Sequence, residues 1–281
     1  MTPSSRIRSL GWRTGLYGTV GLVCLLAILP IAWSLLTSFK TQQEVFSFPP
    51  TFLPERLRIE NYTEIFGASQ YAAFAVNSVV VASLATVGTM VLASLAGYAF
   101  SVFRFPGNAT WMLLILITRM IPGIAIVIPL YIMAQRLGLF DTRLNLIILY
   151  MTTTLPLAIW LLKASFDTIP QDLLDAARID GCGNLRTLVR VVVPVAAPGI
   201  VTTLVITFLA NWNEFLLAQI FTATTASKTL PVAVGELTQH EYGIHWGNLS
   251  AMGMAIVFPT LILAVFIQRY VVSGLMAGSM K

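Results

Sequence analysis

Long apolar runs alternate with shorter polar segments along this chain. A helix that crosses the hydrocarbon core of a bilayer needs about 20 consecutive, mainly apolar residues. Six runs reach that length, and none contains more than one charged residue. They predict six transmembrane helices, at residues 16–36, 75–102, 110–134, 144–162, 193–221 and 249–267. The predicted fold class is therefore all-α, a polytopic membrane protein, with residues 1–281 forming a single transmembrane domain.

The first apolar run follows a basic N-terminal segment, so a cleaved signal peptide is an alternative. Arg6, Arg8 and Arg13 precede the run. The apolar part of a signal peptide spans about 7 to 15 residues and ends in small residues. The run here is longer and ends in Ile-Ala-Trp-Ser-Leu-Leu at residues 31–36. We therefore expect an uncleaved membrane anchor.

Composition excludes several other classes of protein. The 281 residues are 57% hydrophobic and 10% charged, with a mean hydropathy of +0.81, whereas an average globular chain is roughly 25% charged. A cytosolic enzyme and a disordered chain are therefore excluded. The net charge of +5 comes from scattered Lys and Arg, which do not form the basic run typical of nucleic-acid binding. Cys24 and Cys182 are too few for a disulfide framework, so both are expected to be free thiols.

The distribution of basic residues predicts the orientation in the membrane. Six spans place both termini on the same side. If the N-terminus is cytoplasmic, the inner segments carry ten Lys and Arg and the outer segments carry six, with Arg119 inside a span. Cytoplasmic loops are generally enriched in Lys and Arg. We therefore predict that both termini lie in the cytoplasm.

The segment between the fourth and fifth runs, residues 163–190, predicts a structured loop rather than a simple turn. Pro170 suits the first turn of a helix, where no intrahelical N–H bond is lost. Asp172 and Asp175 favour the N-terminal part of that helix, because the helix dipole is positive there. Gly181 and Gly183 are helix stops.

The short helix in this loop is expected to be amphipathic. Its apolar side chains fall roughly on one side at helical spacing; they are Leu173, Leu174, Ala177 and Ile179. A plain turn between spans is the simpler interpretation, but a loop of nearly 30 residues with an apolar face favours a docking element for a soluble partner. A second short helical stretch is expected to follow it and to lead into the fifth span, and we expect the cytoplasmic helix to act as a rigid lever continuous with that span.

The same loop resembles a motif of the permease subunits of bacterial ABC importers. That family carries Glu-Ala-Ala, three residues, Gly, nine residues and then Ile-x-Leu-Pro. Here Asp-Ala-Ala at residues 175–177 is followed, at the same spacing, by Gly181 and by Val-Val-Val-Pro at residues 191–194. The spacing is intact, with Asp in place of Glu and Val in place of Ile and Leu. The residues that the resemblance assigns to contact with the ATPase are Asp172, Leu174, Asp175, Ala176, Ala177, Arg178, Asp180 and Gly181.

Further short stretches resemble the carbohydrate-importer branch of that family. They lie in the same order along nearly the whole chain, at residues 60–62, 119–122, 128–131, 138–142, 212–216, 229–232 and 268–278. Each stretch alone is a weak signal, but their order together with the loop motif is specific. The resemblance implies a type I importer fold in the bacterial inner membrane, with this chain as its permease domain.

The resemblance also implies a set of partners. These are a second permease subunit that completes a heterodimer, two ATP-binding subunits and an extracytoplasmic sugar-binding protein, with ATP and Mg²⁺ bound by the ATPase subunits. An independent observation agrees, because the chain has no Gly-x-x-x-x-Gly-Lys-Ser/Thr phosphate loop. We therefore expect a non-catalytic subunit without a cofactor of its own, surrounded by membrane lipid and without a nucleic-acid partner.

Two residues in the third predicted span are candidates for the translocation path. Ionisable groups inside a bilayer are costly and usually functional. Arg119 lies about nine residues into the span, roughly 13 Å at 1.5 Å per residue. Extension of its side chain to the headgroups is the structural alternative. The functional interpretation is a cavity-lining or gate-bracing group near Pro122, where the helix is expected to bend.

The fifth predicted span holds the other candidates for the path, Asn211, Trp212, Asn213 and Glu214. Amides and a carboxylate can pair with sugar hydroxyls, and an aromatic face can cover a sugar ring. Asn211 and Glu214 are three residues apart, so on one helix they would share a face. Polar contacts between helices are the structural alternative. An ion pair between Glu214 and Arg119 is disfavoured, because their estimated depths differ by about 10 Å.

Other functions remain as alternatives at this stage. A stand-alone secondary transporter or channel often shows inverted internal repeats, and no repeat is evident here. A membrane-embedded enzyme would need a catalytic cluster in the spans, where no His or Asp occurs. His240, Glu241 and His245 in a polar loop offer too few ligands for a metal, so no metal site is expected.

Overall fold

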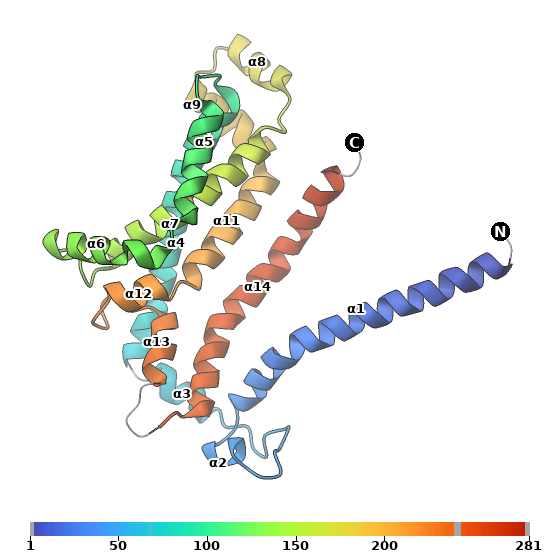
Figure 1. Ribbon diagram of the computed structural model, residues 1–281, viewed down its shortest axis with the longest axis vertical. Helices are drawn as coiled ribbons and strands as arrows, with labels where there is room; N and C mark the ends of the chain where they lie inside the picture. Colours follow the sequence, from blue (N-terminus) through green and yellow to red (C-terminus); the bar gives the residue numbers. More distant parts are fainter. Residues whose placement is uncertain (1–2, 68, 239–242, 279–281) are drawn as a thin grey trace. The chain divides into compact units, whose positions relative to one another are not determined.

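The computed structural model describes residues 3–67, 69–238 and 243–278 (Figure 1). Its secondary structure in these ranges is helical, without a strand. The elements are α1 (Pro3–Thr37), α2 (Gln42–Val45), α3 (Glu60–Gly67), α4 (Ser69–Val102), α5 (Asn108–Ile117), η1 (Thr118–Met120), α6 (Gly123–Arg136), α7 (Arg143–Phe166), α8 (Gln171–Ile179), α9 (Asn184–Thr187), η2 (Leu188–Val192), α10 (Val193–Val195), α11 (Ala197–Trp212), α12 (Leu216–Phe221), α13 (Leu230–Leu237) and α14 (Trp246–Gly278). The predicted all-α class is confirmed.

Four of the six predicted spans are single helices that are long and apolar enough to cross a membrane. They are Gly15–Thr37, Gln70–Val102, Arg143–Phe166 and Trp246–Phe266. Each contains one of the predicted apolar runs almost in full. Cys24 and Cys182 are free, as expected.

The third and fifth predicted spans are broken, which confirms the bend expected near Pro122 in the third and adds an unexpected bend in the fifth. Asn108–Met120 and Gly123–Arg136 meet at 89°, and Asn184–Val195 and Ala197–Trp212 meet at 87°. The first break has a clear cause: Ile121 precedes a proline and is extended, with ψ 120°, since proline disfavours helical backbone in the residue before it. The described residues therefore hold four spans, or up to six if each bent pair counts as one.

The chain divides into two compact units. The first comprises residues 1–68 and 236–255, and the second comprises residues 69–235 and 256–281. The first contains α1, the short helices α2 and α3, and the start of α14 (Figure 1). The assignment of residues 1–281 to one permease domain stays a prediction.

The second unit is built on the close packing of α4 against α7. Small residues on α4 permit the approach, and a Cβ atom added at Gly97 would lie 3.1 Å from the backbone nitrogen of Lys163. Thr89 and Thr154 share a hydrogen bond of 3.1 Å between the two helices. Small residues and interhelical hydroxyl bonds are the main means by which helices associate in lipid.

We expect Gly97→Leu to destabilise the protein by about 2 kcal/mol, because overpacking a close helix contact forces the backbones apart. The matched control is Gly21→Leu on α1, where an added Cβ atom meets nothing within 4 Å. Thermal unfolding of both variants in detergent measures the difference. Equal melting temperatures for the two variants would contradict this account of the α4–α7 contact.

Candidate functional site

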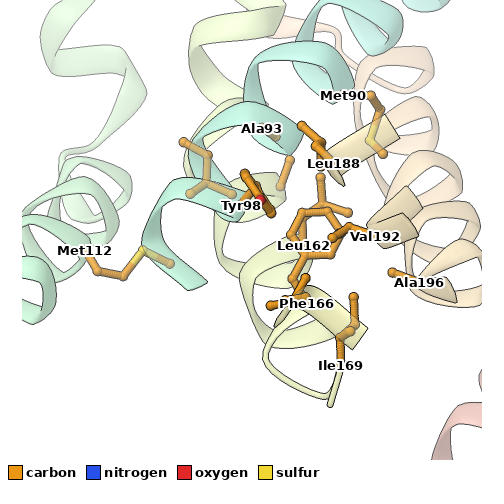
Figure 2. Close-up of a cluster of buried hydrophobic side chains, with 13 residues drawn as sticks. Met90, Ala93, Tyr98, Met112, Leu162, Phe166, Ile169, Leu188, Val192 and Ala196 are labelled. Carbon is orange, nitrogen blue, oxygen red and sulfur yellow. The ribbon is translucent and has the colours of Figure 1, made fainter. Parts of the chain in front are cut away.

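Helix α8 is anchored to the second unit by one face. Leu174 is 3% exposed and Ala177 is 5% exposed. Leu174 belongs to a buried cluster with Phe166 at the end of α7, Ile169 in the segment that follows α7, and Val192 of η2. Figure 2 shows this cluster, in which side chains from α4, α7 and η2 converge. The predicted structured loop therefore rests on the ends of the membrane helices.

The C-terminus of α8 explains the glycine of the loop motif. Gly181 has a φ of +75°, a backbone conformation that side-chain-bearing residues rarely adopt. Its N–H donates to the carbonyl of Arg178 at 3.0 Å, and the N–H of Cys182 donates to the carbonyl of Ala177 at 2.9 Å. This pair of bonds is a Schellman motif. It ends α8 sharply and fixes the direction of the chain toward α9.

The rest of α8 is exposed and carries charged side chains together with two large apolar ones. Ile179 is 86% exposed and Leu173 is 42% exposed, so the prediction that all four apolar side chains cluster on one side is wrong for Ile179. A helix turns about 100° per residue, which puts Leu174 and Ala177 on one face, Leu173 at the edge of that face and Ile179 on the opposite side. Asp175 pairs with Arg178 at 2.9 Å on this accessible surface. Asp172, Ala176 and Asp180 are also exposed.

Helix α8 is not continuous with the fifth span, which corrects the expectation of one rigid lever. Residues 180–183 separate α8 from α9, and the 87° bend lies between Val195 and Ala197. The connection from α8 to α11 therefore runs through the buried cluster and the short helices, rather than through a single helix axis.

Asn211, at the end of α11, is buried rather than cavity-lining. It is 3% exposed, and its amide donates to the hydroxyl of Thr86 on α4 at 3.1 Å. Trp212 is also buried: its Nε1 donates to the carbonyl of Ile256 at 3.0 Å, and its ring stacks on Phe208 with centroids 5.9 Å apart. Both side chains join helices within the second unit.

Glu214 lies beyond the end of α11, so it does not share a helix face with Asn211, contrary to the prediction. Its carboxylate accepts the N–H groups of Leu217 at 3.0 Å and Ala218 at 3.2 Å, which caps the start of α12. Asn213 is exposed, and its amide donates to the carbonyl of Leu209 at 2.8 Å. Unlike Asn211 and Trp212, Asn213 and Glu214 have side chains that are at least partly accessible to solvent.

Arg119 and Pro122 lie at the 89° break between α5 and α6. Both are exposed, and the guanidinium of Arg119 donates to the carbonyl of Thr153 on α7. Pro122 is the N-cap residue of α6. The ion pairs among the described residues do not include Arg119 or Glu214. The role of these residues in a translocation path stays a prediction.

Asp141 forms a tight connection that sequence reasoning missed. It adopts a left-handed backbone conformation, with φ 59°, in the turn before α7. Its carboxylate accepts the N–H groups of Ala223 at 2.8 Å and Thr224 at 3.0 Å, together with the hydroxyls of Thr224 and Ser227. Burial opposes ionisation, but these hydrogen bonds outweigh it and lower the pKa of Asp141 to about 2.

We expect Asp141→Asn to lower stability by about 1–2 kcal/mol at neutral pH, since hydrogen bonds to a charged acceptor are lost. A carboxyl whose pKa is depressed on folding contributes stability above its ordinary value of 3.8, and this contribution is lost as the pH falls through about 2. The difference between wild type and variant should therefore shrink over that window. Thermal unfolding in detergent across this pH range measures it, and a constant difference would contradict the assignment.

Clusters of three or more His, Cys, Asp or Glu that could hold a metal ion are absent from the described part of the chain. His240 and Glu241 lie outside the described residues. Of the residues considered earlier for a metal, only His245 is therefore placed.

Comparison with known proteins identifies the family of the chain. Residues 89–276 match the model of the binding-protein-dependent transport system inner membrane component. The trehalose transport system permease protein SugB of Mycobacterium tuberculosis is 35% identical over 97% of this chain and 100% of its own length. The sulfoquinovosyl glycerol transport system permease protein SmoH of Agrobacterium fabrum is 36% identical over 90% of this chain and 89% of its own.

A solved structure shares the fold. It is a chain of a bacterial ABC transporter involved in the import of the acidic polysaccharide alginate, with a TM-score of 0.79 and 20% identity over 96% of this chain and 98% of that chain. The family match and the two relatives each extend over most of the chain, and they agree with the bent apolar helices and the anchored loop. The chain therefore belongs to the binding-protein-dependent transport system inner membrane components, and it is a multi-pass protein of the inner membrane.

Proposed function

We propose that this chain is one permease subunit of an ATP-driven sugar importer, and that helix α8 receives the force of the ATPase. The observation that carries the proposal is the two-sided character of α8. Leu174 fixes it to the buried cluster and Ala177 is buried on the same face, while Ile179 offers an apolar side chain to a partner. A helix that is packed on one face and exposed on the other can transmit a movement of a soluble subunit to α7 and η2.

The proposed assembly contains a second, different permease subunit, two ATP-binding subunits and an extracytoplasmic sugar-binding protein. ATP and Mg²⁺ would be held by the ATP-binding subunits, since this sequence has no phosphate loop. The chain would accordingly be non-catalytic and without a cofactor of its own. Both termini and α8 would lie in the cytoplasm, as the excess of Lys and Arg in those segments favours.

A carbohydrate is the proposed cargo. The relatives SugB and SmoH are named for the transport of trehalose and sulfoquinovosyl glycerol. Within this chain, Asn213, Glu214 and Arg119 are the polar candidates that retain access from outside, so we propose them, with Pro122, as the contribution of this subunit to the path. Asn211 and Trp212 would hold the helices that carry them.

The function is tested by purifying the chain with its candidate ATP-binding subunits and reconstituting uptake in vesicles. We expect a stable complex and sugar uptake that requires ATP hydrolysis together with the binding protein. Uptake that continues without ATP would instead indicate a secondary transporter. For the path, Glu214→Gln and Asn213→Ala should change the uptake kinetics without preventing assembly; unchanged kinetics would leave both residues with structural roles alone.

A further inference from the structure

A pocket of about 240 Å³ lies within the first unit, between the end of α1, the segment that follows it and the start of α14. Two tryptophans, a buried lysine and hydroxyl groups line it. The residues that matter to the argument are Trp33, Lys40, Glu44, Thr51, Trp246 and Ser250. None of them belongs to the loop or the path described above.

The pocket lies at the membrane boundary. One membrane-spanning segment ends at Thr37 and another begins at Trp246. Gln42 brings the two ends to the same level, since it accepts the N–H of Trp246 at 3.1 Å and donates to the carbonyl of Ile244 at 2.8 Å. Trp33 lies four residues before Thr37 and therefore about 6 Å deeper, within the headgroup layer where tryptophan is enriched.

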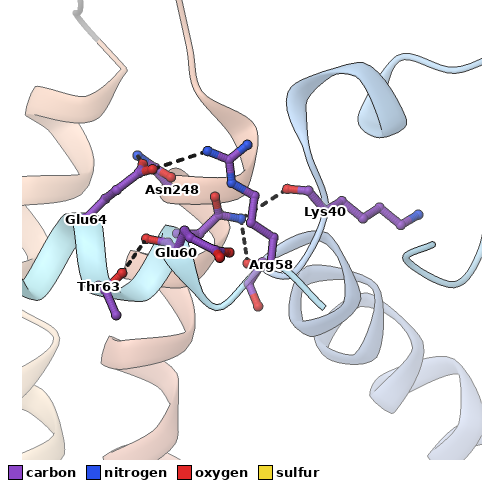
Figure 3. Close-up of polar contacts among 8 residues, drawn as sticks. Lys40, Arg58, Glu60, Thr63, Glu64 and Asn248 are labelled. Atoms are coloured by element: carbon purple, nitrogen blue, oxygen red, sulfur yellow. Dashed lines mark hydrogen bonds and ion pairs between the residues drawn. The ribbon is translucent and has the colours of Figure 1, made fainter. Parts of the chain in front are cut away.

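The pocket contains a buried cation, Lys40, whose charge interacts with the Glu44 carboxylate without forming a direct ion pair. Lys40 is 2% exposed; its ammonium donates to the carbonyl of Thr51 and lies 4.9 Å from the centre of the Trp33 ring. No ion pair of Lys40 occurs among the described residues. In Figure 3 its side chain extends away from the ion pair of Arg58 and Glu64. A buried charge without a direct ion-pair partner is costly, so the site favours an anion.

Other polar groups around Lys40 agree with an anionic ligand. The Thr51 hydroxyl is buried without a hydrogen-bond partner and is free to donate. The carboxylate of Glu44 is already engaged, because it accepts the N–H groups of Thr41 at 2.6 Å and Glu55 at 2.8 Å. The anion would therefore meet one ammonium and one hydroxyl beside a carboxylate whose oxygens are occupied.

An apolar surface adjoins the pocket. Phe46, Phe48, Phe52 and Leu53 are 67–97% exposed. The rings of Phe52 and Trp33 are in contact, with centroids 6.0 Å apart and an angle of 81°. This contact places the segment that contains Phe52 beside the end of α1. Large apolar side chains at that depth are suited to acyl chains rather than to water.

We propose that this pocket binds the phosphodiester headgroup of a membrane phospholipid, with the phosphate at Lys40 and Thr51 and the acyl chains along residues 46–53. A soluble glycerophosphodiester has the same headgroup chemistry. The exposed apolar side chains beside the pocket favour the lipid as its source. The lipid would fasten the segment between α1 and α3 to the bilayer.

Native mass spectrometry of the detergent-purified complex, titrated with phosphatidylethanolamine, tests the proposal. We expect Lys40→Met to weaken the tightest lipid adduct about tenfold, as loss of a charged hydrogen bond implies. The matched control is Arg56→Met, which removes an exposed cation from the same segment outside the pocket and should leave the adduct unchanged. Equal lipid retention by wild type and Lys40→Met would overturn the proposal.

Lys40 also donates a hydrogen bond to the carbonyl of Thr51, so Lys40→Met removes this contact as well. A second variant therefore leaves Lys40 in place. Ser250→Leu fills the pocket from α14 and should weaken the adduct to a similar degree. A parallel titration with glycerophosphoethanolamine separates the two sources of the headgroup. Binding of this soluble compound as tightly as the lipid would overturn the assignment to a lipid, whereas lipid binding alone supports it.

Discussion

Ile179→Lys is expected to weaken association with the ATP-binding subunits by about 30-fold, while the permease itself remains fully stable. Ile179 is 86% exposed at the end of α8, so it stabilises nothing within this chain. A buried apolar anchor at an interface typically contributes about 2 kcal/mol, which corresponds to that change in affinity. Lysine is chosen because a positive charge near a helix C-terminus is favourable, so the helix itself is not weakened.

The measurement is a titration of detergent-solubilised permease with the ATP-binding subunits, accompanied by thermal unfolding of the permease alone. Leu57→Lys is the matched control, because Leu57 is an exposed leucine outside residues 163–190. We expect the control to bind like wild type and both variants to melt within experimental error of it. Wild-type affinity in Ile179→Lys would show that the exposed face of α8 is not the docking surface.

Helix α8 could be predicted closely because its signals are local. Pro170 precedes α8 and Gly181 follows it, and the structure begins the helix at Gln171 and ends it at Ile179. Proline at a helix start and glycine just after its end act through backbone geometry alone. The direction in which Leu173 and Ile179 point was not predictable with the same certainty, since four apolar residues in one turn and a half admit more than one buried face.

Hydropathy is insensitive to backbone direction, so the bend in the fifth span was missed and only Pro122 indicated the bend in the third. An apolar run continues through Ile121 and Pro122 without change of character, yet the chain turns by 89° there. Pro122 is the signal that located this break. In the fifth span, Pro194 and Pro198 lie on either side of the bend at Ala196.

The functions of the polar residues were the least predictable part. Asn211 meets Thr86, which lies 125 positions away in the chain, and Asp141 meets Ser227, which lies 86 positions away. Neither contact can be recognised from the spacing of residues that are close in the sequence. A buried amide with a partner and a cavity-lining amide therefore look alike in sequence, and only the packing of α4 against α11 separates them.

Leu174→Ala is expected to lower sugar uptake more than about fivefold while ATP hydrolysis continues. Leu174 is 3% exposed and packs with Phe166 and Val192, so truncation removes about 2–4 kcal/mol of packing. This loss is comparable to the free energy that keeps a locally unfolding segment in place. We therefore expect α8 to remain folded on the ATPase but to move independently of α7. A movement of α8 is then no longer transmitted to the membrane helices.

The informative quantity is the ratio of sugar transported to ATP hydrolysed in reconstituted vesicles, combined with hydrogen exchange of the amides of α8. Leu173→Ala is the matched control, since this neighbour on the same helix is 42% exposed. We expect Leu174→Ala to lower both the ratio and the protection of α8, and Leu173→Ala to preserve the protection. Ile179 is expected to affect the affinity for the ATP-binding subunits, and Leu174 the transmission of movement from α8 to α7. Ile179→Lys should therefore lose binding, whereas Leu174→Ala should keep binding and lose transport. Loss of uptake and hydrolysis in equal proportion in Leu174→Ala would mean that the buried face serves docking as well, and that α8 and α7 do not move as one body.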